Sequence, residues 1–168
     1  MSDGRALVLR PTPYDSDVVR SLEAQVQAHY REIYGGEDES GTDTDEFAGP
    51  DGVFLVGWVG DEPVATGGLR RHDERSAEIK RMYVVPEHRG HGHARELLAG
   101  LEDFAERVGY AEVVLETGAR QPDAIALYES SGYRRIENFG YYQDSPLCRS
   151  FAKTLPPRQL PDPLPARW

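Results

Sequence analysis

Hydrophobic residues along this chain gather in two kinds of segment, short continuous runs and stripes with helical spacing. The continuous runs predict strands at residues 6–9, 53–59, 64–69, 77–85, 111–116, 133–137 and 148–155. Residues 60–63, Gly-Asp-Glu-Pro, predict a turn, so the second and third strands form an antiparallel hairpin. Later strands alternate with helices, which is typical of an α/β domain.

Three segments repeat their apolar residues every three or four positions and are predicted helices. Their stripes are Val19, Leu22, Val26, Tyr30 and Ile33 in the first, Ala94, Leu97, Leu98, Leu101, Phe104 and Ala105 in the second, and Ala124, Leu127, Tyr128 and Ser131 in the third. Asp15-Ser16-Asp17 can cap the first helix, while Gly109 and Gly132 suit the ends of the second and third.

The length of 168 residues allows one domain with a full hydrophobic core. We expect this domain at residues 1–155, followed at 156–168 by an extended or disordered tail with five prolines. The single cysteine, Cys148, excludes an internal disulfide and favours a reducing cytoplasm. The net charge of −10 argues against free nucleic acid as a partner, and no segment resembles a membrane span or a secretory signal.

A glycine-rich turn, residues 89–95, separates the predicted strand 77–85 from the second helix. Gly90 and Gly92 allow the backbone to bend closely, and the free amides of the turn and of the helix N-terminus favour a negative charge. We therefore expect a phosphate-bearing ligand here, the alternative being an ordinary turn before a helix. A P-loop pattern is absent, and Arg95 stands where a dinucleotide fingerprint requires its third glycine.

Two motifs resemble those of one family. Arg89-x-x-Gly92-x-Ala94 resembles the Arg/Gln-x-x-Gly-x-Gly/Ala signature of the GNAT superfamily, the GCN5-related N-acetyltransferases. Residues 121–133 are similar to its motif Asn-x-x-Ala-x-x-Leu-Tyr-x-x-x-Gly-Phe/Tyr, with Gln121 in the asparagine position. The resemblance implies a single α/β domain whose mixed, twisted central sheet has about six to seven strands flanked by helices.

The resemblance also implies acetyl-CoA (coenzyme A) as co-substrate, with no metal. The cofactor-binding residues that it implies are Met82, Tyr83, Val84, Arg89, Gly90, His91, Gly92, His93, Ala94, Arg95, Gln121 and Tyr128. In the family the strand before the turn usually carries a bulge and splays from its neighbour, which frees an amide for the thioester carbonyl. His88, His91 and His93 lie close in sequence, but no acidic or cysteine ligand completes a metal site.

Acetyl transfer to an amine needs a base for the amine and an acid for the departing thiolate. By resemblance Tyr128 is the candidate acid, although its place on an apolar stripe also suits packing. Glu78 is the candidate base; the alternative is a structural carboxylate paired with Lys80 or Arg70. Glu116-Thr117 brings a second carboxylate to the same splay, which could bind the amine or serve as the base instead.

The acceptor is expected to be a small-molecule amine or amino acid, because aromatic residues occur where the family binds its substrates. The residues expected to bind it are Tyr30, Tyr34, Arg70, Glu116, Thr117 and Tyr141, with Phe139 and Tyr142 nearby. The acid-rich loop at 35–52 could fence the entrance or be a solvated loop. A non-catalytic acyl-CoA-binding sensor and a protein N-acetyltransferase remain alternatives, as do a monomer and a homodimer.

Overall fold

The computed structural model describes residues 6–38 and 42–157, and it contains one seven-stranded sheet. The strands are β1 (Val8–Pro11), β2 (Val53–Val59), β3 (Glu62–Arg71), β4 (Ser76–Val84), β5 (Glu112–Gly118), β6 (Arg134–Ile136) and β7 (Cys148–Thr154). Their order across the sheet is β1-β2-β3-β4-β5-β7-β6. Only the central β4–β5 pair is parallel, so the sheet is mixed as the sequence predicts.

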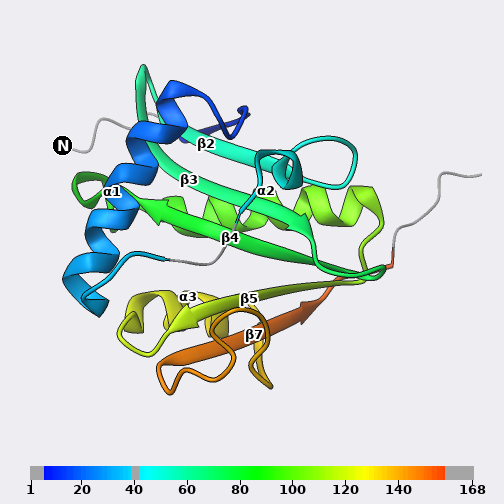
Figure 1. The fold of residues 1–168 in the computed structure, drawn as a ribbon. Helices are drawn as coiled ribbons and strands as arrows, with labels where there is room; N and C mark the ends of the chain where they lie inside the picture. Colours follow the sequence, from blue (N-terminus) through cyan, green and yellow to red (C-terminus); the bar gives the residue numbers. More distant parts are fainter. Residues whose placement is uncertain (1–5, 39–41, 158–168) are drawn as a thin grey trace, which may run out of the picture.

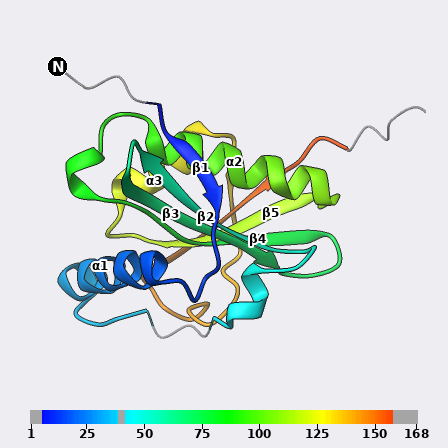
Figure 2. The same ribbon diagram turned by 90° about the horizontal axis from the view of Figure 1, so that it is seen from above.

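Three α-helices cover the sheet: α1 (Asp17–Tyr34), α2 (His93–Val108) and α3 (Pro122–Ser130). In Figures 1 and 2, α1 lies on one face and α2 and α3 lie on the other. Two 3-10 turns, η1 (Thr44–Phe47) and η2 (Pro86–His88), complete the elements of the described residues. This is the layered α/β architecture that the alternation of strands and helices indicates.

The helical stripes of the sequence form much of the core. Val19, Leu22 and Val26 of α1 and Leu97, Leu98 and Leu101 of α2 are at most 2% exposed. Burial of each such aliphatic side chain contributes about 1.5–3 kcal/mol. The α2 stripe packs so closely on β3 that a Cβ at Gly67 would lie 3.0 Å from Leu101 Cδ1.

Several predicted boundaries shift. The first strand lies at Val8–Pro11 rather than 6–9, because its pairing with Leu55 to Trp58 of β2 begins at Val8. β3 starts at Glu62 and runs to Arg71, since it pairs with both neighbours. The strand predicted at 133–137 is only Arg134–Ile136, at the edge of the sheet. Most of the predicted tail, residues 158–168, lies outside the described residues, as do residues 1–5.

The two central strands separate after a short stretch of pairing. β4 and β5 pair only from Ser76–Glu112 to Ile79–Leu115, and beyond these positions no further pairs join them. On its other side, β4 carries an extra residue: Gly68 pairs with Lys80 but Thr66 pairs with Tyr83, so two residues, Arg81 and Met82, face Gly67. The strand therefore has both the splay and the β-bulge that the resemblance implies.

None of the helices within residues 6–38 and 42–157 is long and apolar enough to cross a bilayer.

Candidate active site

Two cavities open at the place where β4 and β5 separate. The first, of about 550 Å³, lies beside the glycine turn, and we call it the glycine-turn cleft. The second, of about 380 Å³, lies between the splayed strands, and we call it the splay cavity. Five residues line both, so the two spaces adjoin: Tyr30, Met82, Gln121, Ala124 and Tyr128.

The glycine-turn cleft is built by the end of β4, the turn and the first residues of α2 and α3. Gly90 and Gly92 have positive φ angles of 82° and 81°, a backbone conformation that other residues rarely adopt. Gly92 is the residue before α2, so the free amides of the first helical turn face this region. Such a helix N-terminus stabilises an anion.

Two arginines of the turn are held by the surrounding structure. Arg89 donates from Nε to the Val84 carbonyl oxygen at 2.9 Å, and its guanidinium lies 5.4 Å from the centre of the Tyr83 ring. Arg95 donates to the hydroxyls of Ser130 and Ser131 at 2.9 and 3.0 Å, which joins α2 to the end of α3. Both guanidinium groups therefore add positive charge to a cleft already suited to phosphate groups.

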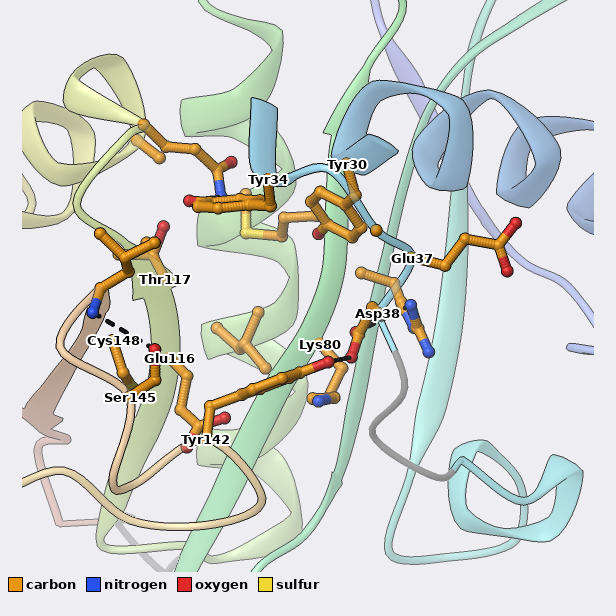
Figure 3. Close-up of a pocket in the computed structure, with 18 of the residues that line it drawn as sticks. Tyr30, Tyr34, Glu37, Asp38, Lys80, Glu116, Thr117, Tyr142, Ser145 and Cys148 are labelled. Carbon is orange, nitrogen blue, oxygen red and sulfur yellow. Dashed lines mark hydrogen bonds and ion pairs between the residues drawn. The ribbon is translucent and has the colours of Figure 1, made fainter. Parts of the chain in front are cut away.

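The splay cavity is lined by aromatic, acidic and basic side chains (Figure 3). Its lining residues come from four parts of the chain: the end of α1 and the following loop, β4, β5 with α3, and the loop before β7 with the first residue of that strand. They include Tyr30, Tyr34, Asp38, Lys80, Glu116, Thr117, Tyr142, Ser145 and Cys148. A concave space of this volume suits a small organic molecule.

Glu116, at the end of β5, presents its carboxylate to the splay cavity. Burial, with a further contribution from the charge of Glu78, raises its pKa to about 7. Its Oε1 atom is buried and has no hydrogen-bond partner among the described residues. A half-buried carboxyl that titrates near neutrality can accept a proton from a bound ligand.

Tyr128 lies at the junction of the two cavities and is 6% exposed. Burial raises the pKa of its hydroxyl to about 12, so the group is protonated at neutral pH. Among the described residues, the hydroxyl has one polar contact, a weak one to Met82 Sδ at 3.9 Å. The hydroxyl is therefore available as a donor to a group bound where the cavities meet.

The sequence of this chain is similar to that of one protein family. The model of the GNAT acetyltransferase family matches residues 23–133, which include both cavities' central elements. The chain belongs to the GNAT acetyltransferase family. The IAA acetyltransferase of Azospirillum brasilense is 33% identical over 149 residues, which cover 88% of this chain and 97% of the relative.

Two crystal structures illustrate the shared GNAT fold. A Klebsiella pneumoniae protein named as an acyl-CoA N-acyltransferase superposes with a TM-score of 0.75 and 29% identity, covering 89% of this chain and 97% of its own. A GNAT acetyltransferase from Elizabethkingia anophelis, solved with acetyl-CoA bound, has a TM-score of 0.67 at 17% identity and covers 89% and 98% of the two chains. GNAT enzymes use acetyl-CoA, whose pyrophosphate is an anion of the kind that helix N-terminal amides bind.

Almost all the residues predicted to bind acetyl-CoA lie together in this GNAT domain. The glycine-turn cleft is lined by Met82, Tyr83, Val84, Arg89, Gly90, Gly92, His93, Ala94, Arg95, Gln121 and Tyr128. His91 is exposed and is absent from the lining, although its ring lies 5.8 Å from that of His93. Within the described residues, no group of three or more metal-binding side chains could hold a metal ion.

The two carboxylates proposed as bases occupy different surroundings. Glu78 is 4% exposed, and its Oε1 accepts a hydrogen bond from Arg70 Nε at 2.9 Å and forms an ion pair with Arg70 Nη2 at 2.9 Å. Arg70 also binds Glu46. Neither Glu78 nor Arg70 lines the splay cavity, whereas Glu116 does. The geometry thus favours Glu116 over Glu78 as the carboxylate that a molecule bound in the splay cavity would contact.

The other predicted acceptor residues are divided by the structure. Tyr30, Tyr34 and Thr117 line the splay cavity. Tyr34 accepts a hydrogen bond at 3.1 Å from Gln121, which fixes the end of α1 against the start of α3. Tyr141 is 63% exposed and does not line the cavity, while the adjacent Tyr142 does.

Several residues of the splay cavity were not among the residues predicted to bind the acceptor. Asp38, Lys80, Arg81, Ser145 and Cys148 all line the splay cavity. Lys80 follows Glu78 by two positions on β4, so alternation along a strand could have placed it on the same face. Asp38 belongs to the acid-rich loop, but only the fold shows that its side chain lines the splay cavity. Glu39, another acid of this loop, lies outside the described residues.

Proposed function

We propose that this protein transfers the acetyl group of acetyl-CoA to the primary amine of a small molecule, by direct attack while both substrates are bound. The observation that carries this proposal is the junction of the two cavities at Tyr128 and Met82. With the thioester at that junction, an amine in the splay cavity lies beside its carbonyl carbon. Such positioning is worth several kcal/mol, with about 7–11 kcal/mol as the upper range.

Glu116 is the proposed base. An alkylammonium has a pKa of about 10, so the acceptor must lose a proton before its nitrogen can attack. A carboxylate with a pKa of about 7, in the cavity that holds the amine, can take that proton directly or through a water molecule. The place of Glu116 in the wall of the splay cavity supports this role, because an ammonium donor bound there can approach the carboxyl group.

Tyr128 is the proposed acid. The amine nitrogen bonds to the acetyl carbon, the carbon–sulfur bond breaks, and the electron pair of that bond goes to sulfur. The nitrogen releases its remaining extra proton to solvent as the amide forms. The Tyr128 hydroxyl then donates its proton to the thiolate, and the proton held by Glu116 returns to the phenolate through solvent. Donation is strongest at the moment when the negative charge develops on sulfur. The bulge at Arg81–Met82 would supply an amide to the carbonyl oxygen.

The walls of the splay cavity support a small acceptor. Two loops form part of these walls and are joined to each other, since the Tyr142 hydroxyl in the loop before β7 donates to Asp38 Oδ1 in the loop after α1 at 3.0 Å. Acids and tyrosines together suit a cationic amine with an organic body. IAA, which is in the name of a 33% identical relative, belongs in any substrate panel as a comparator.

The test is thiol release from acetyl-CoA with a panel of amino acids, aromatic amines, polyamines, aminoglycosides, IAA and lysine peptides. Turnover with a small amine, lost in Glu116→Gln, is the expected result. Turnover with lysine peptides alone would instead indicate a protein acetyltransferase. Acetyl-CoA binding without turnover across the panel would contradict catalysis and favour a sensor.

A further inference from the structure

Arg81 adopts a backbone conformation that is unusual for its residue type. Its φ angle is +61°, and it is the single non-glycine residue with positive φ among those that the structure describes. L-residues pay a steric penalty in this region, and a bulge of this kind usually has glycine there. An arginine that tolerates this strain on a catalytic strand needs a compensating role.

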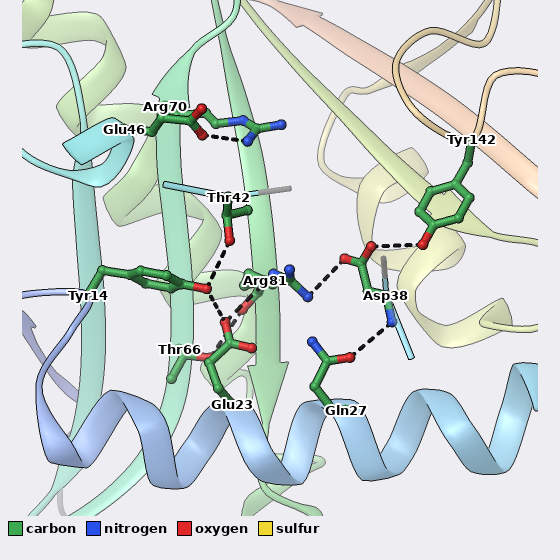
Figure 4. Close-up of polar contacts among 10 residues, drawn as sticks. All are labelled: Tyr14, Glu23, Gln27, Asp38, Thr42, Glu46, Thr66, Arg70, Arg81 and Tyr142. Atoms are coloured by element: carbon green, nitrogen blue, oxygen red, sulfur yellow. Dashed lines mark hydrogen bonds and ion pairs between the residues drawn. The ribbon is translucent and has the colours of Figure 1, made fainter. Parts of the chain in front are cut away.

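The Arg81 side chain is buried between β4 and α1, where it meets two carboxylates (Figure 4). Nη1 lies 2.9 Å from Asp38 Oδ2, and Nε lies 3.6 Å from Glu23 Oε1. Neither contact has the alignment of a hydrogen bond, so both act as charge pairs. The side chain is only 5% exposed, which keeps water from screening these charges.

The backbone of the bulge is held from the opposite strand. Thr66, 1% exposed on β3, donates its hydroxyl to the Arg81 carbonyl oxygen at 3.1 Å. The bulge is thus fixed twice, at its carbonyl by Thr66 and at its side chain by the two acids.

The same contacts continue to the acceptor side of the site. Asp38 accepts from the Tyr142 hydroxyl at 3.0 Å, and its own amide donates to Gln27 Oε1 at 2.9 Å. Asp38 and Tyr142 both line the splay cavity. Met82, the residue after Arg81, lines both cavities. One line of contacts, Tyr142 to Asp38 to Arg81, therefore connects the acceptor walls with the segment beside the thioester position.

We propose that Arg81 is a positioning residue that ties the acceptor loop to the bulge, so that the bulge amide is aimed at the thioester carbonyl. This role rests on the proposed acetyl transfer. Arg81 touches neither reacting group in this scheme. Its backbone conformation orients the bulge amide. Its charge pairs fix the position of Asp38, and with it the walls of the proposed acceptor site, relative to that amide.

Two substitutions of Arg81 separate the effect of its backbone conformation from the effect of its charge pair with Asp38. Glycine adopts positive φ without strain, so Arg81→Gly keeps the bulge and loses the tie to Asp38. Arg81→Ala loses both. Binding of acetyl-CoA and of CoA is measured by titration calorimetry, since only acetyl-CoA has the carbonyl that the amide would bind. Arg134→Ala, which removes an ion pair with Glu112 away from both cavities, is the control.

We expect Arg81→Ala to weaken acetyl-CoA about fivefold, the loss of roughly one hydrogen bond, with the CoA affinity within about twofold of wild type. Arg81→Gly should keep both affinities and lower kcat/KM for the amine about tenfold, as should Asp38→Asn. Arg134→Ala should change none of these.

Equal loss of CoA and acetyl-CoA affinity in Arg81→Ala would show a general structural role and overturn the proposal. Unchanged kcat/KM in both Arg81→Gly and Asp38→Asn would also overturn it. If Arg81→Ala does not fold, the kcat/KM values of Arg81→Gly and Asp38→Asn alone test the proposal. A wild type without turnover on any amine would refute the proposed function, while the comparison of acetyl-CoA with CoA would still test the bulge.

Discussion

Gly140 packs directly against the carboxylate of Glu116: a Cβ at this glycine would lie 2.8 Å from Oε1. Gly140 also has a φ angle of +77°, which favours glycine. The loop before β7 thus fixes the position of the proposed base through the absence of a side chain.

Gly140→Ala should therefore displace Glu116 and lower kcat by about tenfold, since small misplacements of a catalytic group are costly. The strained φ should also cost about 1–2 kcal/mol of unfolding free energy. Gly49→Ala is a matched control, because Gly49 has a φ of +73° and open space around its Cβ. Equal activity losses in the two variants would show that strain, and not contact with Glu116, is responsible.

Glu116→Gln should remove a titration from the pH–rate profile. The carboxyl must be ionised to act as a base, so the wild-type rate should rise with pH through about 7. The variant should lose about 10²-fold or more in kcat and should not show this rise. Glu78→Gln is the comparison. If it abolishes the rise while Glu116→Gln retains it, Glu78 is the base.

The same carboxyl makes a separate prediction for stability. Its pKa is raised from 4.5 to about 7 in the folded state, so the folded state binds a proton more readily than the unfolded state. This contribution to stability is present below pH 4.5 and is lost as the pH rises to about 7. Wild type should therefore lose stability relative to Glu116→Gln across this range, as measured by urea unfolding at several pH values. A constant difference would contradict the raised pKa.

Tyr128→Phe tests the proposed acid with little structural disturbance. Within the part of the chain that the structure describes, the hydroxyl's one polar contact is the 3.9 Å approach to Met82 Sδ, so the unfolding free energy should change by less than about 1 kcal/mol. Activity should fall by about 10²-fold if the hydroxyl protonates the thiolate. A loss of only a few-fold, with acetyl-CoA affinity retained, would assign Tyr128 to packing alone.

Gly118→Ala should disturb the wall of the acceptor site. A Cβ at Gly118, the last residue of β5, would overlap the Tyr34 hydroxyl. Tyr34 would have to move and release its hydrogen bond from Gln121, so we expect the KM for the amine to rise several-fold. Tyr34→Phe removes the same hydrogen bond without the overlap. If both variants raise KM equally, the hydrogen bond and not the wall is what matters.

Features that depend on local pattern could be predicted from the sequence. The apolar stripe of α2 is buried as expected, and the turn at Gly90 and Gly92 has the positive φ angles that its glycines suggest. Local chemistry determines both, because helix amphipathicity and glycine conformation involve only near neighbours.

Features that depend on partners far along the chain could not. The sequence leaves Glu78 open as a base or as a carboxylate paired with Lys80 or Arg70, and the pairing of β3 with β4 is what brings Arg70 opposite it. Tyr142 reaches Asp38 across 104 positions of sequence, and no local signal separates it from the exposed Tyr141. Interactions of this kind follow from the fold, so the acceptor site was the least predictable part.

The loop at 137–147 contributes Tyr142, Ser145 and Leu147 to the splay cavity and no residue to the glycine-turn cleft. Although five residues line both cavities, this loop therefore forms part of the proposed acceptor site without forming part of the proposed acetyl-donor site. Exchanging this loop between GNAT proteins, with its glycine opposite Glu116 retained, offers a route to new acceptor preferences on an unchanged donor site.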